Sequence, residues 1–276
     1  MKRILTIQDI SCVGKCSLTV ALPIISAFGV ECSVLPTAVL STHTAFNGFT
    51  FRDLTEDISP ITEHWKNQNI TFDAIYTGYL GSFKQLELVE KILSDFKSDS
   101  NFILVDPVMA DNGKLYAGFD ESFAAAMTNL CSKADIIVPN LTEAAYLLNR
   151  KYIACGYDEK YIKDTLIKLT DLGAKIAVLT GVSFDQNEIG VYAHNKATGE
   201  FFSYFREHLP QSFHGTGDVF ASTLCGCLNK CNDLNSALKT AVDFTVDSIK
   251  KTIENPNKNW YGVDFESALP NLIKSI

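Results

Sequence analysis

Short runs of apolar and β-branched residues recur along the chain and alternate with longer amphipathic stretches. The apolar runs cover residues 4–7, 32–35, 74–76, 102–105, 136–138 and 176–179. Stretches of helical length with one apolar face lie between most of them, for example residues 83–96, 121–131 and 159–172. Repeated alternation of a buried strand and an amphipathic helix is typical of a parallel sheet with helices on its faces. The pattern therefore predicts an α/β fold, a three-layer sandwich around a mostly parallel central sheet.

The last third of the chain departs from this alternation. Residues 188–193 and 201–205 are rich in β-forming side chains and flank a turn-like sequence at residues 195–199, which predicts a hairpin. Two helical segments, residues 217–228 and 234–253, are then expected to close the chain. Because no low-complexity linker or repeat separates these parts, we expect one domain that spans residues 1–276.

Composition and charge narrow the classes of function. The chain has 46% hydrophobic and 20% charged residues, which is ordinary for a globular protein with a buried core. A net charge of −8 argues against a nucleic-acid partner, because such a partner requires a basic surface. The basic N-terminus precedes an apolar run that is too short for a signal peptide or a membrane span. We therefore expect neither nucleic acid nor a membrane as a partner.

The eight cysteines are scattered along the chain and contain no Cys-x-x-Cys pair, so the sequence does not indicate a disulfide framework. A metal site is one interpretation of the three closely spaced cysteines Cys225, Cys227 and Cys231. They lie, however, in an apolar helical run, where a free cysteine is commonly a small buried residue. We favour core residues and expect a reducing, cytoplasmic location.

The segment His214-Gly215-Thr216-Gly217-Asp218 is the strongest chemical signal in the sequence. Its glycines allow a sharp turn and a close approach of the backbone to a ligand. A helix that begins here directs N–H groups and the positive end of its dipole at the same point, which suits a phosphoryl group. Asp218 would accept a proton from an attacking hydroxyl group, or would only cap the helix, and local sequence is compatible with both.

Other polar residues follow predicted strands, at the sheet edge where ligands bind in such folds. Asp106 stands directly before a proline, so it is either a strand-ending turn residue or a carboxylate available to Mg²⁺ through water. Asn140 and Glu143 have the spacing of a helix cap with an acidic residue three positions later. Thr180 follows another strand.

Together, five segments resemble the ribokinase superfamily and, within it, the vitamin B6 kinases. They are residues 41–44 (Ser-Thr-His-Thr), 77–82 (Thr-Gly-Tyr-Leu-Gly-Ser), 106–109 (Asp-Pro-Val-Met), 139–143 (Pro-Asn-Leu-Thr-Glu) and 215–218 (Gly-Thr-Gly-Asp). The resemblance runs in the family's order over residues 3 to 250. It implies a ribokinase-like fold and ATP-dependent phosphorylation of the 5′-hydroxymethyl group of pyridoxal, pyridoxine or pyridoxamine. It also implies Mg²⁺ and a homodimer, and it leaves open whether a monovalent cation is required.

The same resemblance implies roles for individual residues. Asp218 is the expected catalytic base, and the turn of Gly215, Thr216 and Gly217 is expected to hold the γ-phosphate. The residues expected to contact the substrate are Asp9, His43, Thr44, Tyr79 and His214. The residues expected on the nucleotide side are Asp106, Asp111, Asn140, Glu143 and Thr180, with Asp106 and Glu143 reaching Mg²⁺ through water.

Two departures from the family pattern bear on the substrate. Asp9 replaces the usual serine after the first strand, and our hypothesis is that it contacts a ring nitrogen or ring hydroxyl of the substrate. His214 stands directly before the glycine turn, and in this the chain resembles the hydroxymethylpyrimidine kinases. Those relatives, however, commonly carry cysteine where this chain has Asp218. A pyrimidine alcohol is therefore the closest alternative substrate.

A protein that binds a vitamin without turnover is the alternative from another functional class. Asp218 discriminates between the two, because a binding protein has no need of a base at this position. The cation that offsets the phosphate charge besides Mg²⁺ is left open, with Lys15, Lys114 and Arg52 as candidates.

Overall fold

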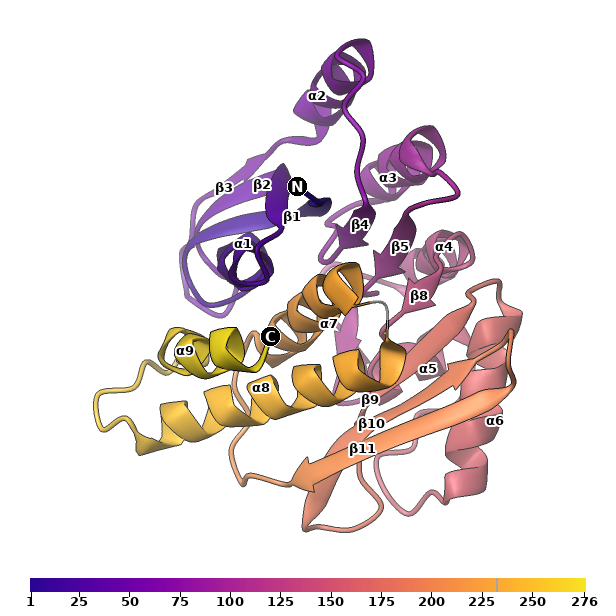
Figure 1. The fold of residues 1–276 in the computed structure, drawn as a ribbon, viewed down its shortest axis with the longest axis vertical. Helices are drawn as coiled ribbons and strands as arrows, with labels where there is room; N and C mark the ends of the chain where they lie inside the picture. Colours follow the sequence, from indigo (N-terminus) through magenta and orange to yellow (C-terminus); the bar gives the residue numbers. More distant parts are fainter. Residues whose placement is uncertain (232) are drawn as a thin grey trace. The chain divides into compact units, whose positions relative to one another are not determined.

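Two structural units make up the chain in this computed structural model, which describes residues 1–231 and 233–276 (Figure 1). The first unit comprises residues 1–78 and 209–276, and the second comprises residues 79–208. Each unit combines strands and helices and is described by itself below. The expectation of a single domain stays a prediction.

The first unit is built on strand β1 (Arg3–Val13), which lies between β4 (Ala74–Thr77) and β2 (Glu31–Thr42) and is parallel to both. Strand β3 (Phe51–Asp53) pairs antiparallel with β2, so the strand order is β4-β1-β2-β3. Ile4, Leu5 and Ile7 of β1 are completely buried. Consecutive buried residues are expected in a central parallel strand, because both of its faces are covered.

Five helices belong to the described part of the first unit. They are α1 (Leu18–Ala27), α2 (Thr55–Asn67), α7 (Thr216–Cys231), α8 (Leu234–Glu254) and α9 (Phe265–Ser275). Helix α7 packs against α1 and α8, and α8 packs against α9, as Figure 1 shows. The start of α7 is thereby held by apolar contacts along the rest of the helix, where Val219, Ala221 and Leu224 are buried.

The second unit contains a sheet with the strand order β5-β8-β9-β10-β11. Its strands are β5 (Phe102–Val105), β8 (Ile136–Ile137), β9 (Ile176–Val182), β10 (Glu188–Asn195) and β11 (Glu200–Glu207). Strands β5, β8 and β9 are parallel, whereas β10 and β11 form the predicted antiparallel hairpin. A short separate hairpin joins β6 (Ala110–Asp111) to β7 (Lys114–Leu115).

The helices of the second unit are α3 (Phe83–Phe96), α4 (Glu121–Cys131), α5 (Leu141–Leu147) and α6 (Glu159–Asp171). Side-chain caps explain where three of them begin: Ser82, Asp120 and Asp158 each accept a hydrogen bond from the backbone N–H three positions later. Such caps satisfy N–H groups that have no partner inside the helix.

Most predicted elements are confirmed, with two corrections. Strand β1 continues to Val13, so Asp9 lies within the strand and not after it. The chain also ends with a third helix, α9, beyond the two that were expected. Cys225 and Cys227 are buried core residues as favoured, and the side chain of Cys231 lies outside the described part. Within the described residues, no helix combines the length and apolar character needed to cross a bilayer.

Candidate active site

The two glycines of the turn before α7 have different surroundings: Gly215 is packed against the backbone, and Gly217 has free space beside it. Gly215 has a φ of 82°, and a β-carbon at this position would lie 1.8 Å from the carbonyl oxygen of Lys15. No side chain fits such a position, so glycine is required. Gly217 differs, because a β-carbon there would meet no atom within 4 Å. The backbone of the turn is therefore approachable at Gly217, as the binding of an anion at a helix N-terminus requires.

Asp218 lies in the first turn of α7 and is half-buried. Burial and, to a smaller extent, the negative charge of Asp9 raise the pKa of Asp218 to about 7, although a hydrogen bond from the backbone N–H of Ser17 works against the shift. A general base is most effective when its pKa lies near the working pH. The environment of Asp218 therefore suits proton transfer at neutral pH better than that of an ordinary capping carboxylate.

Asp9 is the second carboxylate of this region and is 5% exposed. The register of β1 against β2 shifts between Gln8 and Ile10, so Asp9 lies at a sheet irregularity, a feature that commonly redirects a side chain near active sites. Its oxygens accept hydrogen bonds from the hydroxyls of Ser17 (2.6 Å) and Ser11 (3.1 Å). Burial nevertheless raises the pKa of Asp9.

The pKa of Cys16 supports the closeness of these two acids. Burial, together with the charges of Asp218 and Asp9, raises the pKa of the Cys16 thiol to about 12. Because a thiol with such a high pKa is a poor nucleophile at neutral pH, Cys16 is a packing residue of the site.

His43 uses both ring nitrogens inside the protein. Its Nδ1 accepts a hydrogen bond from the backbone N–H of Ala45 (3.2 Å), so its Nε2 donates to the carbonyl oxygen of Tyr261 (2.9 Å). Burial lowers the pKa of His43, which favours this neutral form. The His214 ring centroid lies 5.2 Å from that of His43. Any contact of His43 with a ligand would thus use the face of the ring, while the neighbouring Thr44 is exposed.

The segment between α8 and α9 was missed from the sequence, because it follows the region of family resemblance. The ring centroids of Trp260 and Tyr261 lie 4.5 Å and 5.4 Å from that of Phe46, which in turn contacts His43. The visible signal is the aromatic pair itself, followed by Gly262.

The charged candidates for offsetting phosphate need one correction. The ammonium group of Lys15 is paired with Asp264 and Glu266, at 2.8 Å each, and is therefore engaged within the protein. Lys114 lies in the β6–β7 hairpin and Arg52 on the edge strand β3, and both are exposed.

In the second unit, Asn140 and Glu143 form a complete capping box at the start of α5. Asn140 Oδ1 accepts hydrogen bonds from the N–H groups of Thr142 (2.8 Å) and Glu143 (2.9 Å). Glu143 Oε2 accepts from the N–H of Asn140 (2.8 Å), and its Oε1 accepts from the N–H of Met109 (3.2 Å). The capping interpretation is confirmed. Since both oxygens of Glu143 accept backbone hydrogen bonds, its carboxylate is held in a fixed orientation. Its expected role toward Mg²⁺ through water stays a prediction.

Asp106 and Asp111 lie close to this capping box. Asp106 is 7% exposed, and its charge, after burial and Glu143, raises the pKa of the buried Cys131. Burial raises the pKa of Glu143, and the charge of Asp111 adds to this effect. The hairpin that carries Asp111 is tied to α5 by the hydrogen bond from Asn140 Nδ2 to the Ala110 carbonyl (2.9 Å). The structure thus gathers three predicted carboxylates in the second unit.

Thr180 and Tyr79 complete the predicted residues of the second unit. Thr180 forms an isolated parallel bridge with Asn140, and its N–H donates to the carbonyl of Pro139 (3.0 Å). The ring centroid of Tyr79 lies 5.7 Å from that of Phe119. Thr180 therefore belongs with the capping box, whereas Tyr79 belongs to an aromatic cluster with Phe119.

The oxygen donors of the second unit fit Mg²⁺ better than a softer metal. Across residues 1–231 and 233–276, no group of three or more His, Cys, Asp or Glu side chains is arranged to hold a metal ion. Mg²⁺ commonly keeps several waters and takes one or two carboxylates together with substrate phosphates. Asp106 and Glu143, the residues expected to reach Mg²⁺ through water, are both oxygen donors of the kind that such an ion takes.

The sequence of the chain matches a known family of kinases. The family described as phosphomethylpyrimidine kinase matches residues 25–262, most of the chain. The chain belongs to this kinase family. It is accordingly a phosphotransferase, within the ribokinase superfamily and its pyridoxal kinase branch.

Individual relatives agree with the family over nearly the full length. A candidate phosphomethylpyrimidine kinase from Bacteroides thetaiotaomicron, solved in a crystal form with pyridoxal, is 39% identical, with a TM-score of 0.93 over 98% of this chain and 95% of that one. The pyridoxal kinase from Lactobacillus plantarum is 31% identical, with a TM-score of 0.91 over 100% and 98% of the two chains. The pyridoxal kinase from Arabidopsis thaliana is 25% identical over 99% of this chain and 89% of its own. These matches confirm the predicted fold class, α/β with a mostly parallel sheet flanked by helices.

Proposed function

We propose that the chain is an ATP-dependent kinase that phosphorylates the 5′-hydroxymethyl group of a vitamin B6 ring, giving the 5′-phosphate. The observation that carries this proposal is the pairing of Asp218, whose pKa is about 7, with an approachable glycine turn at the start of α7. A base and a set of backbone donors at one point match the needs of an alcohol that attacks a phosphoryl group.

In the proposed reaction Asp218 accepts the proton of the acceptor hydroxyl as its oxygen attacks the γ-phosphorus of ATP. The bond from the γ-phosphorus to the β,γ-bridging oxygen breaks, and ADP leaves. The N–H groups at the start of α7 stabilise the charge on the transferring group, because the dipole and the unpaired donors of the helix point to its N-terminus. When bound, Mg²⁺ would neutralise phosphate charge, and Asp106 and Glu143 are proposed to reach it through water.

Asp9 is proposed to face the ring of the acceptor. A buried carboxylate that already accepts two hydroxyl hydrogen bonds still has lone pairs free for a ring N–H or hydroxyl donor. A pyridine nitrogen is basic enough to supply such an N–H, which favours a pyridine-based acceptor.

The second candidate function is phosphorylation of a hydroxymethylpyrimidine. The description of the matching family favours this alternative, and His214 immediately before the glycine turn fits it as well. The presence of Asp218 as a carboxylate base at the turn supports the vitamin B6 acceptor. The relative solved with pyridoxal supports the same choice.

A parallel turnover assay tests the proposal. Purified protein is given ATP, Mg²⁺ and one of four acceptors (pyridoxal, pyridoxine, pyridoxamine or hydroxymethylpyrimidine), and ADP and the phosphorylated product are measured. The proposal expects the highest kcat/KM with a B6 vitamer. A preference for the pyrimidine would replace it with the second candidate, and saturable binding without turnover would indicate a vitamin-binding protein. The assay repeated with and without K⁺ tests whether a monovalent cation is required, and the mass of the protein in solution tests the expected homodimer.

A further inference from the structure

The loop between β1 and α1 contacts each part of the first unit that contains a predicted catalytic or substrate residue. Within this loop, the backbone of Lys15 lies against Gly215 of the catalytic turn, where a β-carbon would be 1.8 Å from the Lys15 carbonyl oxygen. Lys15 also lies against Gly262 of the segment before α9, where a β-carbon would be 2.5 Å from Lys15 Cβ. Lys15 is therefore in close contact with two glycines that are far apart in the sequence, and a side chain at either of them would collide with it.

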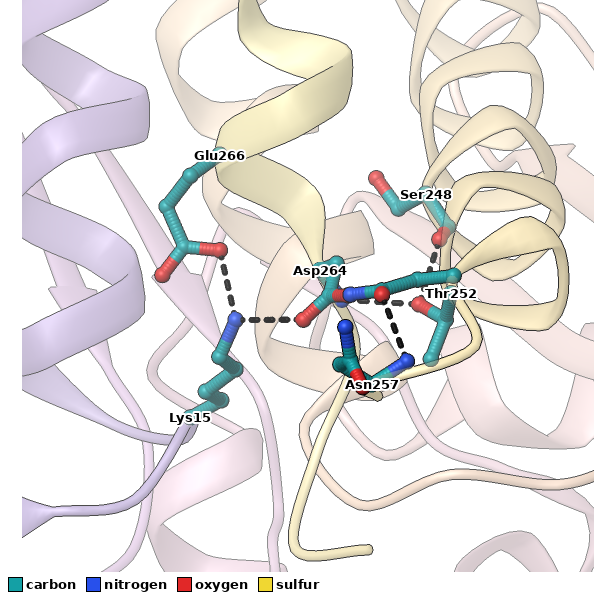
Figure 2. A network of polar contacts seen from close by, with 7 residues as sticks. Lys15, Ser248, Thr252, Asn257, Asp264 and Glu266 are labelled. Carbon is teal, nitrogen blue, oxygen red and sulfur yellow. Dashed lines mark hydrogen bonds and ion pairs between the residues drawn. The ribbon is translucent and has the colours of Figure 1, made fainter. Parts of the chain in front are cut away.

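The side chain of Lys15 is held by two carboxylates (Figure 2). Its Nζ donates hydrogen bonds of 2.8 Å to Asp264 Oδ1 and of 2.8 Å to Glu266 Oε2. The Lys15 side chain is 14% exposed and that of Asp264 is 9% exposed, whereas that of Glu266 is 53% exposed. Exposed ion pairs contribute little stability, so the Asp264 contact is the one that fixes Lys15.

Asp264 is itself immobilised by α8. Its second carboxylate oxygen accepts a hydrogen bond from Asn255 Nδ2 (2.7 Å), and its backbone N–H donates to Thr252 Oγ1 (2.7 Å). The Thr252 hydroxyl donates in turn to the carbonyl oxygen of Ser248 (2.7 Å), as Figure 2 shows. The ammonium of Lys15 is thus tied, through a carboxylate with a fixed orientation, to the body of a 21-residue helix.

The residues that follow Lys15 bear on the catalytic carboxylates. Cys16 is close enough to Asp218 and Asp9 for their charges to raise the pKa of its thiol. Ser17 donates its hydroxyl to Asp9 and its backbone N–H to Asp218. A displacement of Lys15 would therefore shift the glycine turn, the base and Asp9 together.

We propose that Lys15 is a positioning residue for phosphoryl transfer. Its buried ion pair with Asp264 holds the β1–α1 loop against Gly215 and so fixes the turn and Asp218 in their reactive arrangement. The inference rests on the proposed function for the reaction itself, and on the contacts of Lys15 for the positioning. Loss of one partner leaves the other charge buried without compensation, so truncation of either residue should loosen the loop.

Four variants and one control test this role. Lys15→Met and Asp264→Asn each remove the central pair, Lys15→Arg keeps the charge, and Glu266→Gln removes the exposed partner. The control is Glu31→Gln, which breaks the exposed pair with Arg3 in the same unit. For each protein, kcat and KM for ATP and for the acceptor are measured, together with the hydrogen exchange of peptides that cover residues 14–17 and 213–218.

Because small misplacements of reacting groups cost about 10²-fold in rate, we expect Lys15→Met and Asp264→Asn to lower kcat by about 10- to 100-fold. The KM for ATP should stay within about two-fold of wild type, because an interaction that acts only in the transition state changes kcat without changing substrate binding. Exchange in both peptides should become faster. Lys15→Arg should recover most of the lost kcat, and Glu266→Gln and Glu31→Gln should behave like wild type.

Unchanged kcat and unchanged exchange in Lys15→Met would overturn the proposal, and so would an Arg variant as impaired as the Met variant. If Lys15→Met does not fold, Asp264→Asn and Lys15→Arg decide the question by the same readouts. A wild-type protein that turns over none of the acceptors would refute the proposed function. Hydrogen exchange would still test the positioning contacts in that case.

Discussion

The hydroxyl of Ser17 donates a 2.6 Å hydrogen bond to Asp9, the buried carboxylate of β1. The backbone N–H of the same residue donates to Asp218. One residue therefore links two acids that come from opposite ends of the chain, and the charge of Asp9 contributes to the raised pKa of Asp218. The link between Asp9 and Asp218 should affect the pH dependence of the rate, the stability of the fold and the preference among acceptors, and each of these can be measured separately.

The rate of phosphorylation should rise with pH through neutrality. Asp218 must lose its proton to act as a base, and its pKa is about 7, so log kcat/KM should climb with a slope near one below pH 7 and level off above it. Replacing Asp218 by Asn should lower kcat by about 10²- to 10⁴-fold. A pH–rate profile from pH 5 to 9 provides the measurement, and a flat profile would exclude Asp218 as the base.

The same raised pKa should make Asp218 unfavourable for folding at high pH. The folded protein holds the Asp218 proton more tightly than the unfolded chain does, so stability falls as pH rises from about 4 to about 7. Asp218→Asn removes this effect. We expect the variant to melt at a higher temperature than wild type at pH 8 and at the same temperature near pH 4. A variant less stable than wild type at pH 8 would contradict the raised pKa.

The two glycines of the turn should respond differently to alanine. Gly217→Ala introduces a methyl group that meets no protein atom within 4 Å, so the stability of the protein should be kept. The methyl group would obstruct a phosphate at the turn, and kcat/KM should fall by at least about ten-fold, since each 1.36 kcal/mol of lost transition-state stabilisation is ten-fold in rate.

Gly215→Ala is the matched comparison. Its β-carbon would overlap the Lys15 carbonyl oxygen, and the φ of 82° is unfavourable for alanine, so this variant should lose stability as well as activity. Thermal melting and steady-state kinetics on both variants make the distinction. Wild-type activity in Gly217→Ala would argue against phosphate binding at the turn.

Asp9→Asn should change the preference among acceptors more than the rate of the transfer step. The amide keeps the size of the carboxylate and loses the charge that favours a protonated ring nitrogen. We expect kcat/KM to fall most for the acceptors whose ring nitrogen is the more basic, and the pH–rate midpoint to move lower because a neighbouring negative charge is removed. Identical relative kcat/KM values for all acceptors would refute the ring contact.

Asn140 should matter both for stability and for the nucleotide. Asn140→Ala removes the cap of α5 and should lower the free energy of unfolding by about 1 kcal/mol. If the capping box also orders the nucleotide side, the KM for ATP should rise. Asp158→Ala serves as the control, because it removes the cap of α6 and should reduce stability without changing the KM for ATP. Equal KM values in both variants would limit Asn140 to its structural role.

Much of the fold follows from local sequence, and the helices that the sequence does not predict share one feature. Helices α3 and α4 begin and end at the predicted residues, because their amphipathic faces and N-caps are both visible in the sequence. Helices α1, α2 and α9 were not singled out, and each contains an internal proline: Pro23, Pro60 and Pro270. A proline removes a helix hydrogen bond, and tertiary packing outweighs that cost in ways local sequence does not reveal.

Part of the candidate site can also be predicted from local sequence, and part of it cannot. The turn before Asp218 and the capping box of Asn140 and Glu143 are visible in the sequence, because the glycines of the turn and the residue pair of the box form local patterns. Lys15 and Asp264 are 249 positions apart, so no local pattern connects them. Their roles depend on a tertiary contact that the structure alone supplies.

A base that has accepted a proton is useless until it has released that proton. With a pKa of about 7, Asp218 exists in both forms in neutral solution. In the proposed reaction, the proton taken from the alcohol can therefore pass to bulk water between catalytic cycles without help from a second base. Half-burial is thus a compromise. Deeper enclosure would leave the carboxylate permanently protonated, and full hydration would make it too weak to deprotonate an alcohol.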